Sequence, residues 1–232
     1  MLPIRDDAPR STTPFVNYFL IGLNIIIFLF EWWLQVAGGA RARVGFEMQF
    51  AFVPEHVSEW IKGYRPAAVA FVPLFSSMFL HASWPHVLLN MWGLAIFGDN
   101  VEDRLGHFRY LISYLVCGLG ATLTHLIFNL HSTLPSLGAS GAIAGVLGAY
   151  FLLFPSARVL TWFGLFVLWL PAWLVLGYWF VLQFLSGAAT SITYARQMGG
   201  VAFWAHVGGF VTGMALIKLK PARKLDYSFD DN

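Results

Sequence analysis

Long apolar runs, separated by shorter polar stretches, divide the chain into about six helices that could cross or enter a membrane. We expect these helices at Phe15–Val36, 84–104, Phe108–Leu130, Ala139–Phe154, Val159–Leu185 and Ala202–Lys218. A spanning helix needs about 20 consecutive apolar residues, and the fourth helix is shorter than that and rich in glycine. The pattern predicts an all-α membrane protein built as a six-transmembrane-helix bundle.

The segments that precede the second helix carry signals of their own. Residues 37–66 mix charged and aromatic side chains, which indicates an amphipathic interfacial loop that lies in the membrane surface instead of crossing it. Residues 67–80 form an apolar lead-in to the second helix. Ser83 fits the N-cap of that helix and Pro85 fits its first turn.

Polar ends surround one membrane domain, for which we predict the bounds 15–219. Residues 1–14 are expected to form a cytoplasmic N-terminal segment, and residues 220–232 a cytoplasmic tail. The polar segment Ser186–Gly200 joins the fifth and sixth helices. The fifth helix carries bulky aromatic side chains and Pro171, so it is either a moving gate or a passive lipid-facing helix.

Composition agrees with a membrane protein, since 58% of the residues are hydrophobic and only 11% are charged. Soluble domains carry about 25% charged residues. The net charge of +2 gives no electrostatic footprint for nucleic acid, so no nucleic-acid partner is expected. The single cysteine, Cys117, excludes an intrachain disulfide; we interpret it as a packing residue, with a catalytic thiol as the alternative.

Charge distribution predicts the orientation. With six spans both termini lie on one side, and an N-in, C-in topology places nine of the 14 Lys and Arg residues in the cytoplasm. These nine are Arg5, Arg10, Arg104, Arg109, Arg158, Lys218, Lys220, Arg223 and Lys224. No cleavable signal or organellar targeting segment is evident, so we expect a bacterial plasma membrane.

A serine and a histidine stand at the heads of two glycine-spaced apolar helices. Ser140 lies within Gly-Ala-Ser-Gly, and His206 follows 66 residues later. Polar side chains at membrane depth are costly and mark function, although a lone Ser more often bonds to its own helix. Small residues at Gly141, Gly145 and Gly148 and at Ala205, Gly209 and Gly213 predict a close helix seam that joins the two sites.

A nucleophile and its base are the chemistry that such a pair supports. No Asp or Glu occurs between Asp103 and Asp226, so a Ser-His dyad is expected instead of a triad. His86 and Asn90 lie four residues apart on one helix face and could donate to an oxyanion, or form a structural hydrogen-bond pair. No metal motif is present, and neither metal nor cofactor is expected.

In order and spacing, these motifs resemble those of the rhomboid intramembrane serine proteases. The resemblance covers about Phe71–Gly213 and rests on four motifs. They are His81-x4-His86-x3-Asn90, Gly98-x3-Glu102 with Arg104, Gly138-x-Ser140-Gly141, and Ala205-His206-x2-Gly209-x3-Gly213. Two positions depart from the family pattern: Val72-Pro73 replaces Trp-Arg, and Ala144 replaces an aromatic that stacks on the histidine.

The resemblance implies a six-helix rhomboid-like bundle in the lipid bilayer, with a water-filled cavity that opens outward. Ser140 would be the nucleophile and His206 the general base, with the oxyanion hole formed by the Ser140 N–H, His86 and Asn90. Transmembrane protein substrates would be cut near their outer ends, without a metal or cofactor. The alternatives are an inactive relative that binds or escorts transmembrane segments, and a transporter with a histidine relay, which would need intramembrane acids.

Overall fold

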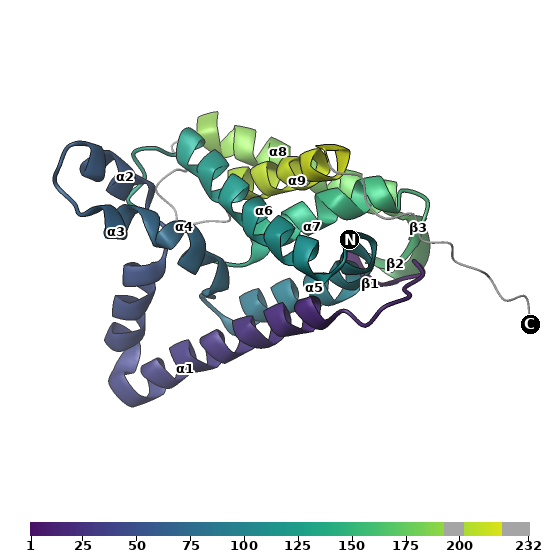
Figure 1. The fold of residues 1–232 in the computed structure, drawn as a ribbon, viewed down its shortest axis with the longest axis horizontal. Coiled ribbons are helices and arrows are strands. Elements are labelled where there is room, and N and C mark those ends of the chain that lie inside the picture. Colours follow the sequence, from purple (N-terminus) through teal and green to yellow (C-terminus); the bar gives the residue numbers. More distant parts are fainter. Residues whose placement is uncertain (193–201, 220–232) are drawn as a thin grey trace, which may run out of the picture.

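The computed structural model describes residues 1–192 and 202–219 and is mostly helical, with one small sheet (Figure 1). Its elements are β1 (Leu2–Asp6), α1 (Phe15–Phe50), α2 (Pro54–Ile61), α3 (Ala67–Phe71), α4 (Pro73–Ser76), the 3-10 helix η1 (Ser77–Phe79), α5 (Trp84–Leu105), α6 (His107–Phe128), α7 (Ser140–Leu153), β2 (Arg158–Phe163), β3 (Phe166–Pro171), α8 (Ala172–Ile192) and α9 (Phe203–Leu219). The predicted tail at 220–232 lies outside the described residues.

Several of these helices suit a membrane. Helices α1, α6 and α8 are long and apolar enough to cross one. Residues Ala67–Phe79 and Trp84–Leu105 form a pair bent by 74°, which counts as a fourth candidate span, whereas α7 and α9 are apolar but shorter. The chain is a multi-pass membrane protein with three or four candidate spans in its described part, and the six-span count stays a prediction.

Glycines bring α7 and α9 into backbone contact, as the small-residue spacing predicted. A Cβ atom placed on Gly209 would lie 2.0 Å from the carbonyl oxygen of Gly141. One placed on Gly213 would lie 1.9 Å from the carbonyl oxygen of Gly145. No side chain larger than hydrogen fits at these distances, so the predicted seam between the fourth and sixth apolar helices is confirmed.

The start of α5 also agrees with the prediction. The lead-in consists of three short helices, α3, α4 and η1, and the chain then turns sharply into α5. The Ser83 hydroxyl accepts a hydrogen bond from the His86 N–H at 3.3 Å, as an N-cap does. This cap fixes the first turns of α5, which carry His86 and Asn90.

The prediction that residues 37–66 form a loop is wrong for most of this segment. Helix α1 continues to Phe50 and bends sharply at Gly39, whose φ of 75° favours glycine (Figure 1). Helix α2 then follows. The sequence suggested a loop because residues 37–66 mix charged and aromatic side chains, but part of that charge is neutralised inside the protein.

Arg43 shows how a charged side chain is accommodated in the part of α1 that follows Gly39. Its side chain is buried and donates hydrogen bonds to Gln35 at 2.8 Å, to Glu47 at 2.6 Å and to the His81 carbonyl at 2.9 Å. The buried Glu31 carboxylate accepts the His81 N–H at 3.1 Å. These bonds hold the chain at His81, directly before α5.

The first half of the predicted fifth helix, Val159–Leu185, is a β-hairpin, and this part of the prediction is wrong. Strands β2 and β3 pair in antiparallel register around Gly164, whose φ is +61°, and β1 pairs with the other edge of β2. Helix α8 begins only at Ala172. Continuous apolar runs do not separate a strand from a helix by periodicity, and here the turn glycine decided the outcome.

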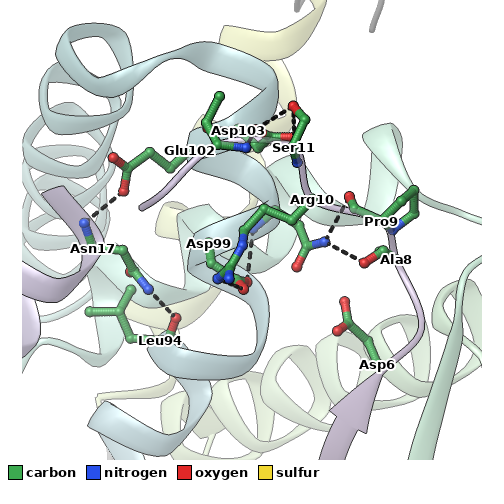
Figure 2. A network of polar contacts seen from close by, with 12 residues as sticks. Asp6, Ala8, Pro9, Arg10, Ser11, Asn17, Leu94, Asp99, Glu102 and Asp103 are labelled. Carbon is green, nitrogen blue, oxygen red and sulfur yellow. Dashed lines mark hydrogen bonds and ion pairs between the residues drawn. The ribbon is translucent and has the colours of Figure 1, made fainter. Parts of the chain in front are cut away.

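Acidic residues at the end of α5 bind the N-terminal segment (Figure 2). Asp103 accepts the N–H groups of Ser11 at 3.0 Å and Thr12 at 2.8 Å. Glu102 accepts the N–H of Asn17 at 2.7 Å, in the first turn of α1. A carboxylate at a helix N-terminus is electrostatically favourable, so Glu102 sets where α1 begins against α5.

Candidate active site

Ser140 is the first residue of α7 and follows a tight turn. Gly138 has a φ of 126° and donates its N–H to the carbonyl of Ser77 at 2.9 Å, which anchors the turn to η1. Ser140 itself is half-buried. Its place at a helix N-terminus exposes it to the positive end of the helix dipole, where developing negative charge is favoured.

His206 lies in the first turn of α9 and faces Ser140. Its Nε2 atom is 2.8 Å from the Ser140 Oγ atom, although 66 residues separate the two in the chain. The backbone contact between Gly209 and Gly141 places both residues at the same end of the seam. The structure therefore brings the predicted pair into hydrogen-bond contact, while their catalytic roles stay predictions.

A second polar contact to His206 comes from α8 and was missed from the sequence. The Oε1 atom of Gln183 lies 2.7 Å from the His206 Nδ1 atom. The ring of Trp179, one helical turn earlier, lies 5.7 Å from the histidine ring between centroids. Gln183 is an amide inside an apolar run, and this was the signal that could have identified it.

Trp179 supplies the aromatic ring beside His206 that Ala144 does not. Ala144 is buried in the seam between α7 and α9. A Cβ atom placed on Gly209 of α9 would lie 3.3 Å from the Ala144 Cβ atom. A ring at this position would meet the α9 backbone. Trp179 from α8 lies beside His206 instead.

His86 and Asn90 lie over the turn that precedes Ser140. A Cβ atom on Gly138 would lie 2.7 Å from His86 Nε2 and 3.8 Å from Asn90 Nδ2, so glycine leaves room for both side chains. Asn90 is 8% exposed, and in the described structure its Nδ2 has no hydrogen-bond partner. The Asn90 amide N–H groups are therefore not taken up by another described residue and can donate to a substrate oxygen.

His81 supports this arrangement from behind. Its ring is fully buried and lies 5.1 Å from the His86 ring, in an edge-on orientation. Its backbone is held by Arg43 and Glu31, as described above. These contacts fix the chain directly before α5.

A cavity of about 840 Å³ joins these residues. Ser140, His206, His86 and Asn90 line it, together with side chains of α5 and α8. Residues Met1–Pro3 also line it, and the Trp92 Nε1–H donates to the Pro3 carbonyl at 2.7 Å. Its volume and these polar side chains provide room and hydrogen-bond partners for water.

A further histidine belongs to this cavity, and it bears on whether a metal could bind there. His125, which is not part of the motifs named above, also lines this cavity. In residues 1–192 and 202–219, no three His, Cys, Asp or Glu side chains lie together as metal ligands would. The expectation that neither metal nor cofactor is needed stays a prediction.

Comparison with known families identifies the fold that carries this site. The rhomboid domain matches residues 69–222, which is more than half of the 232-residue chain. The chain belongs to the rhomboid family. The matched region includes His81, His86, Asn90, Ser140, Gln183 and His206.

Rhomboid relatives from distant organisms share this region. The chain is 32% identical to RHOMBOID-like protein 6, mitochondrial, of Arabidopsis thaliana over 143 residues, or 62% of this chain and 41% of the relative. It is 32% identical to Rhomboid protein 1, mitochondrial, of Saccharomyces cerevisiae over 148 residues, or 62% and 40%. It is 28% identical to the presenilin-associated rhomboid-like protein, mitochondrial, of Bos taurus over 202 residues, or 79% and 50%. The chain thus spans about half the length, or less, of these relatives.

Proposed function

We propose that this rhomboid protein is an intramembrane serine endopeptidase that uses a Ser140–His206 dyad. The contact of 2.8 Å between Ser140 Oγ and His206 Nε2, both of which line a cavity between apolar helices, is the observation that carries the proposal. A serine hydroxyl needs an adjacent base to act as a nucleophile, and the imidazole is in position to supply it.

The proposed reaction follows the two-step pattern of serine hydrolases. Nε2 of His206 takes the hydroxyl proton while Ser140 Oγ bonds to the scissile carbonyl carbon. The Ser140 N–H, His86 and Asn90 then donate to the oxyanion. When the C–N bond breaks, His206 gives the proton to the leaving amine, and water repeats the sequence on the acyl-enzyme to release the new carboxyl group.

The substrates we propose are transmembrane segments of membrane proteins. Lipid contains no water, so hydrolysis requires a polar compartment, and the cavity of about 840 Å³ supports this requirement. A helical substrate hides its scissile carbonyl in a backbone hydrogen bond. We therefore expect faster cleavage of segments that contain Gly or Pro near the outer end. Equal cleavage rates for a broken and an uninterrupted helix of the same composition would contradict this expectation.

The topology we propose has six spans, with α7 and α9 as short internal helices and both termini in the cytoplasm. The excess of Lys and Arg at the ends opposite Ser140 supports this orientation. We propose a bacterial plasma membrane, as the sequence suggested. Cysteine-accessibility labelling at Ser156 and Ser132, which lie at opposite ends of α7, tests the orientation in intact cells.

An inactive relative that binds or escorts transmembrane segments is the competing function. Labelling of the purified full chain by a fluorophosphonate separates the two, since the probe reacts only with an activated serine. We expect labelling at Ser140, and its loss in Ser140→Ala and His206→Ala. Ser156→Ala, which alters an exposed serine, is the matched control and should be labelled like the wild type. A folded wild-type protein that resists labelling would support the escort function and reject the protease.

A further inference from the structure

Two hydrogen bonds to opposite ring nitrogens determine the orientation of His206. Nε2 lies 2.8 Å from Ser140 Oγ, and Nδ1 lies 2.7 Å from Gln183 Oε1. The amide oxygen can only accept, so Nδ1 carries the proton and donates it. Nε2 is then left with its lone pair toward the serine hydroxyl, which is the tautomer that a general base requires.

The amide takes the place that an acid holds in a Ser-His-Asp triad. The sequence from Asp103 to Asp226 contains no other carboxylate, so no acid on α6 to α9 can serve the histidine. A neutral acceptor also avoids a fixed charge within the apolar helices, where a charge is costly. His206 is 7% exposed, and Gln183 is the described side chain that contacts its Nδ1 atom.

We infer that Gln183 is a positioning residue of the protease and links α8 to the general base, an inference that rests on the proposed function. Gln183 orients His206 only while α8 is packed against α9. The binding of α8 is therefore part of the catalytic arrangement and not merely part of the wall of the cavity.

The packing of α8 makes this link conditional. Helix α7 is held to α9 by backbone contact at glycines, as at Gly209 and Gly141. Helix α8 meets α9 through large rings, with Phe180 4.7 Å from Phe210 between centroids. Contacts between flexible side chains separate at lower cost than a glycine seam, so a displaced α8 would withdraw Gln183 and leave His206 without its orienting bond.

Gln183→Met tests the inference, because methionine has a similar length and removes the acceptor. We expect the fluorophosphonate labelling rate and kcat to fall about 10- to 100-fold, the range found when a metal-bound histidine loses the partner that orients it. KM and the melting temperature should stay near wild-type values. Leu185→Met, at an exposed position of α8, is the matched control and should change neither rate.

Gln183→Glu separates orientation from packing, since a carboxylate accepts the same hydrogen bond and should restore labelling well above the Gln183→Met level. If Gln183→Glu does not fold, Gln183→Met decides alone through its separation of kcat from KM.

Wild-type labelling by Gln183→Met would overturn the inference while leaving the protease intact. Equal loss in both variants with a lowered melting temperature would also overturn it, in favour of a packing role. Failure of the wild-type protein to react would instead reject the proposed function.

Discussion

Gly209 lies so close to the carbonyl oxygen of Gly141 that a Cβ atom at this position would be only 2.0 Å from it. The contact is between two backbones, so no side-chain rotation can relieve it. Gly209→Ala should destabilise the protein by about 1–3 kcal/mol or more, because overpacking forces the helices apart. Loss of activity should accompany the lower melting temperature, since α7 and α9 carry Ser140 and His206.

Gly177 on α8 provides the matched control for this substitution. A Cβ atom there would lie 3.7 Å from Phe151, which is an ordinary contact. Gly177→Ala should therefore leave stability unchanged or raise it slightly, because alanine favours the helix. If Gly209→Ala and Gly177→Ala had the same melting temperature, α7 and α9 would not be in backbone contact.

Gly145→Leu should lower both the melting temperature and the activity, as Gly209→Ala does. A Cβ atom at Gly145 would lie 2.2 Å from Cys117 Cβ.

Asn90→Ala and His86→Ala should each lower kcat more than they raise KM. An oxyanion donor acts mainly in the transition state, and loss of a principal donor costs about 2.7–4 kcal/mol. The loss is smaller where the remaining donors compensate. Asn90 Nδ2 has no partner in the described structure, so its removal breaks no hydrogen bond at that atom and should spare the melting temperature.

Leu88→Ala, at an exposed position between the two donors on α5, should leave both kinetic constants unchanged. Steady-state kinetics on a transmembrane substrate measures the difference. A change confined to KM in Asn90→Ala would place this residue in substrate binding instead.

The contact between Ser140 and His206 could be predicted from the sequence, because both residues lie on helices with regularly spaced small residues. Spacing of glycines fixes which helix faces meet, and that in turn fixes the position of each polar residue near a helix start. His86 and Asn90 followed from the same logic, since four residues bring side chains to one helix face.

Gln183 and the β-hairpin could not be predicted in this way. The run from Val159 to Leu185 is apolar on all sides, so periodicity indicated neither the hairpin nor the face of α8 that meets His206. Arg43 and Glu31 posed the opposite problem, because their burial depends on contacts with the distant His81 backbone. Long-range polar pairs of this kind leave no local pattern.

The attachment of β1 should depend on pH through Asp6. Burial raises the pKa of the Asp6 carboxyl from 3.8 to about 6; the hydrogen bond from Tyr150 lowers it and the charge of Asp99 raises it, both by less. The folded protein therefore holds this proton more tightly than the unfolded chain does. Its contribution to stability is fully present below about pH 4 and is lost as the pH rises through about 6.

A melting temperature that falls across this interval checks the Asp6 prediction. Asp6→Asn, which keeps the side chain uncharged at every pH, should flatten that part of the profile. Asp7→Asn, at the exposed neighbouring position, should keep most of the slope. A wild-type slope retained in Asp6→Asn would assign the effect to another group.

Movement of α8 away from α5 is the last prediction, and it distinguishes a gate from a passive lipid-facing helix. Leu89 on α5 and Leu182 on α8 both line the cavity and are 59% and 42% exposed, so cysteines at these positions can be joined by a cleavable bismaleimide linker. Cys117→Ala supplies the cysteine-free background, and it should be fully active because Cys117 is buried and only packs.

A gate requires that the linker slow cleavage of a transmembrane substrate and that reductant restore the rate. The small fluorophosphonate should still label Ser140 at the unlinked rate, since the linker keeps Gln183 against His206. Transmembrane cleavage at the same rate with and without the linker would leave α8 as a fixed wall of the cavity.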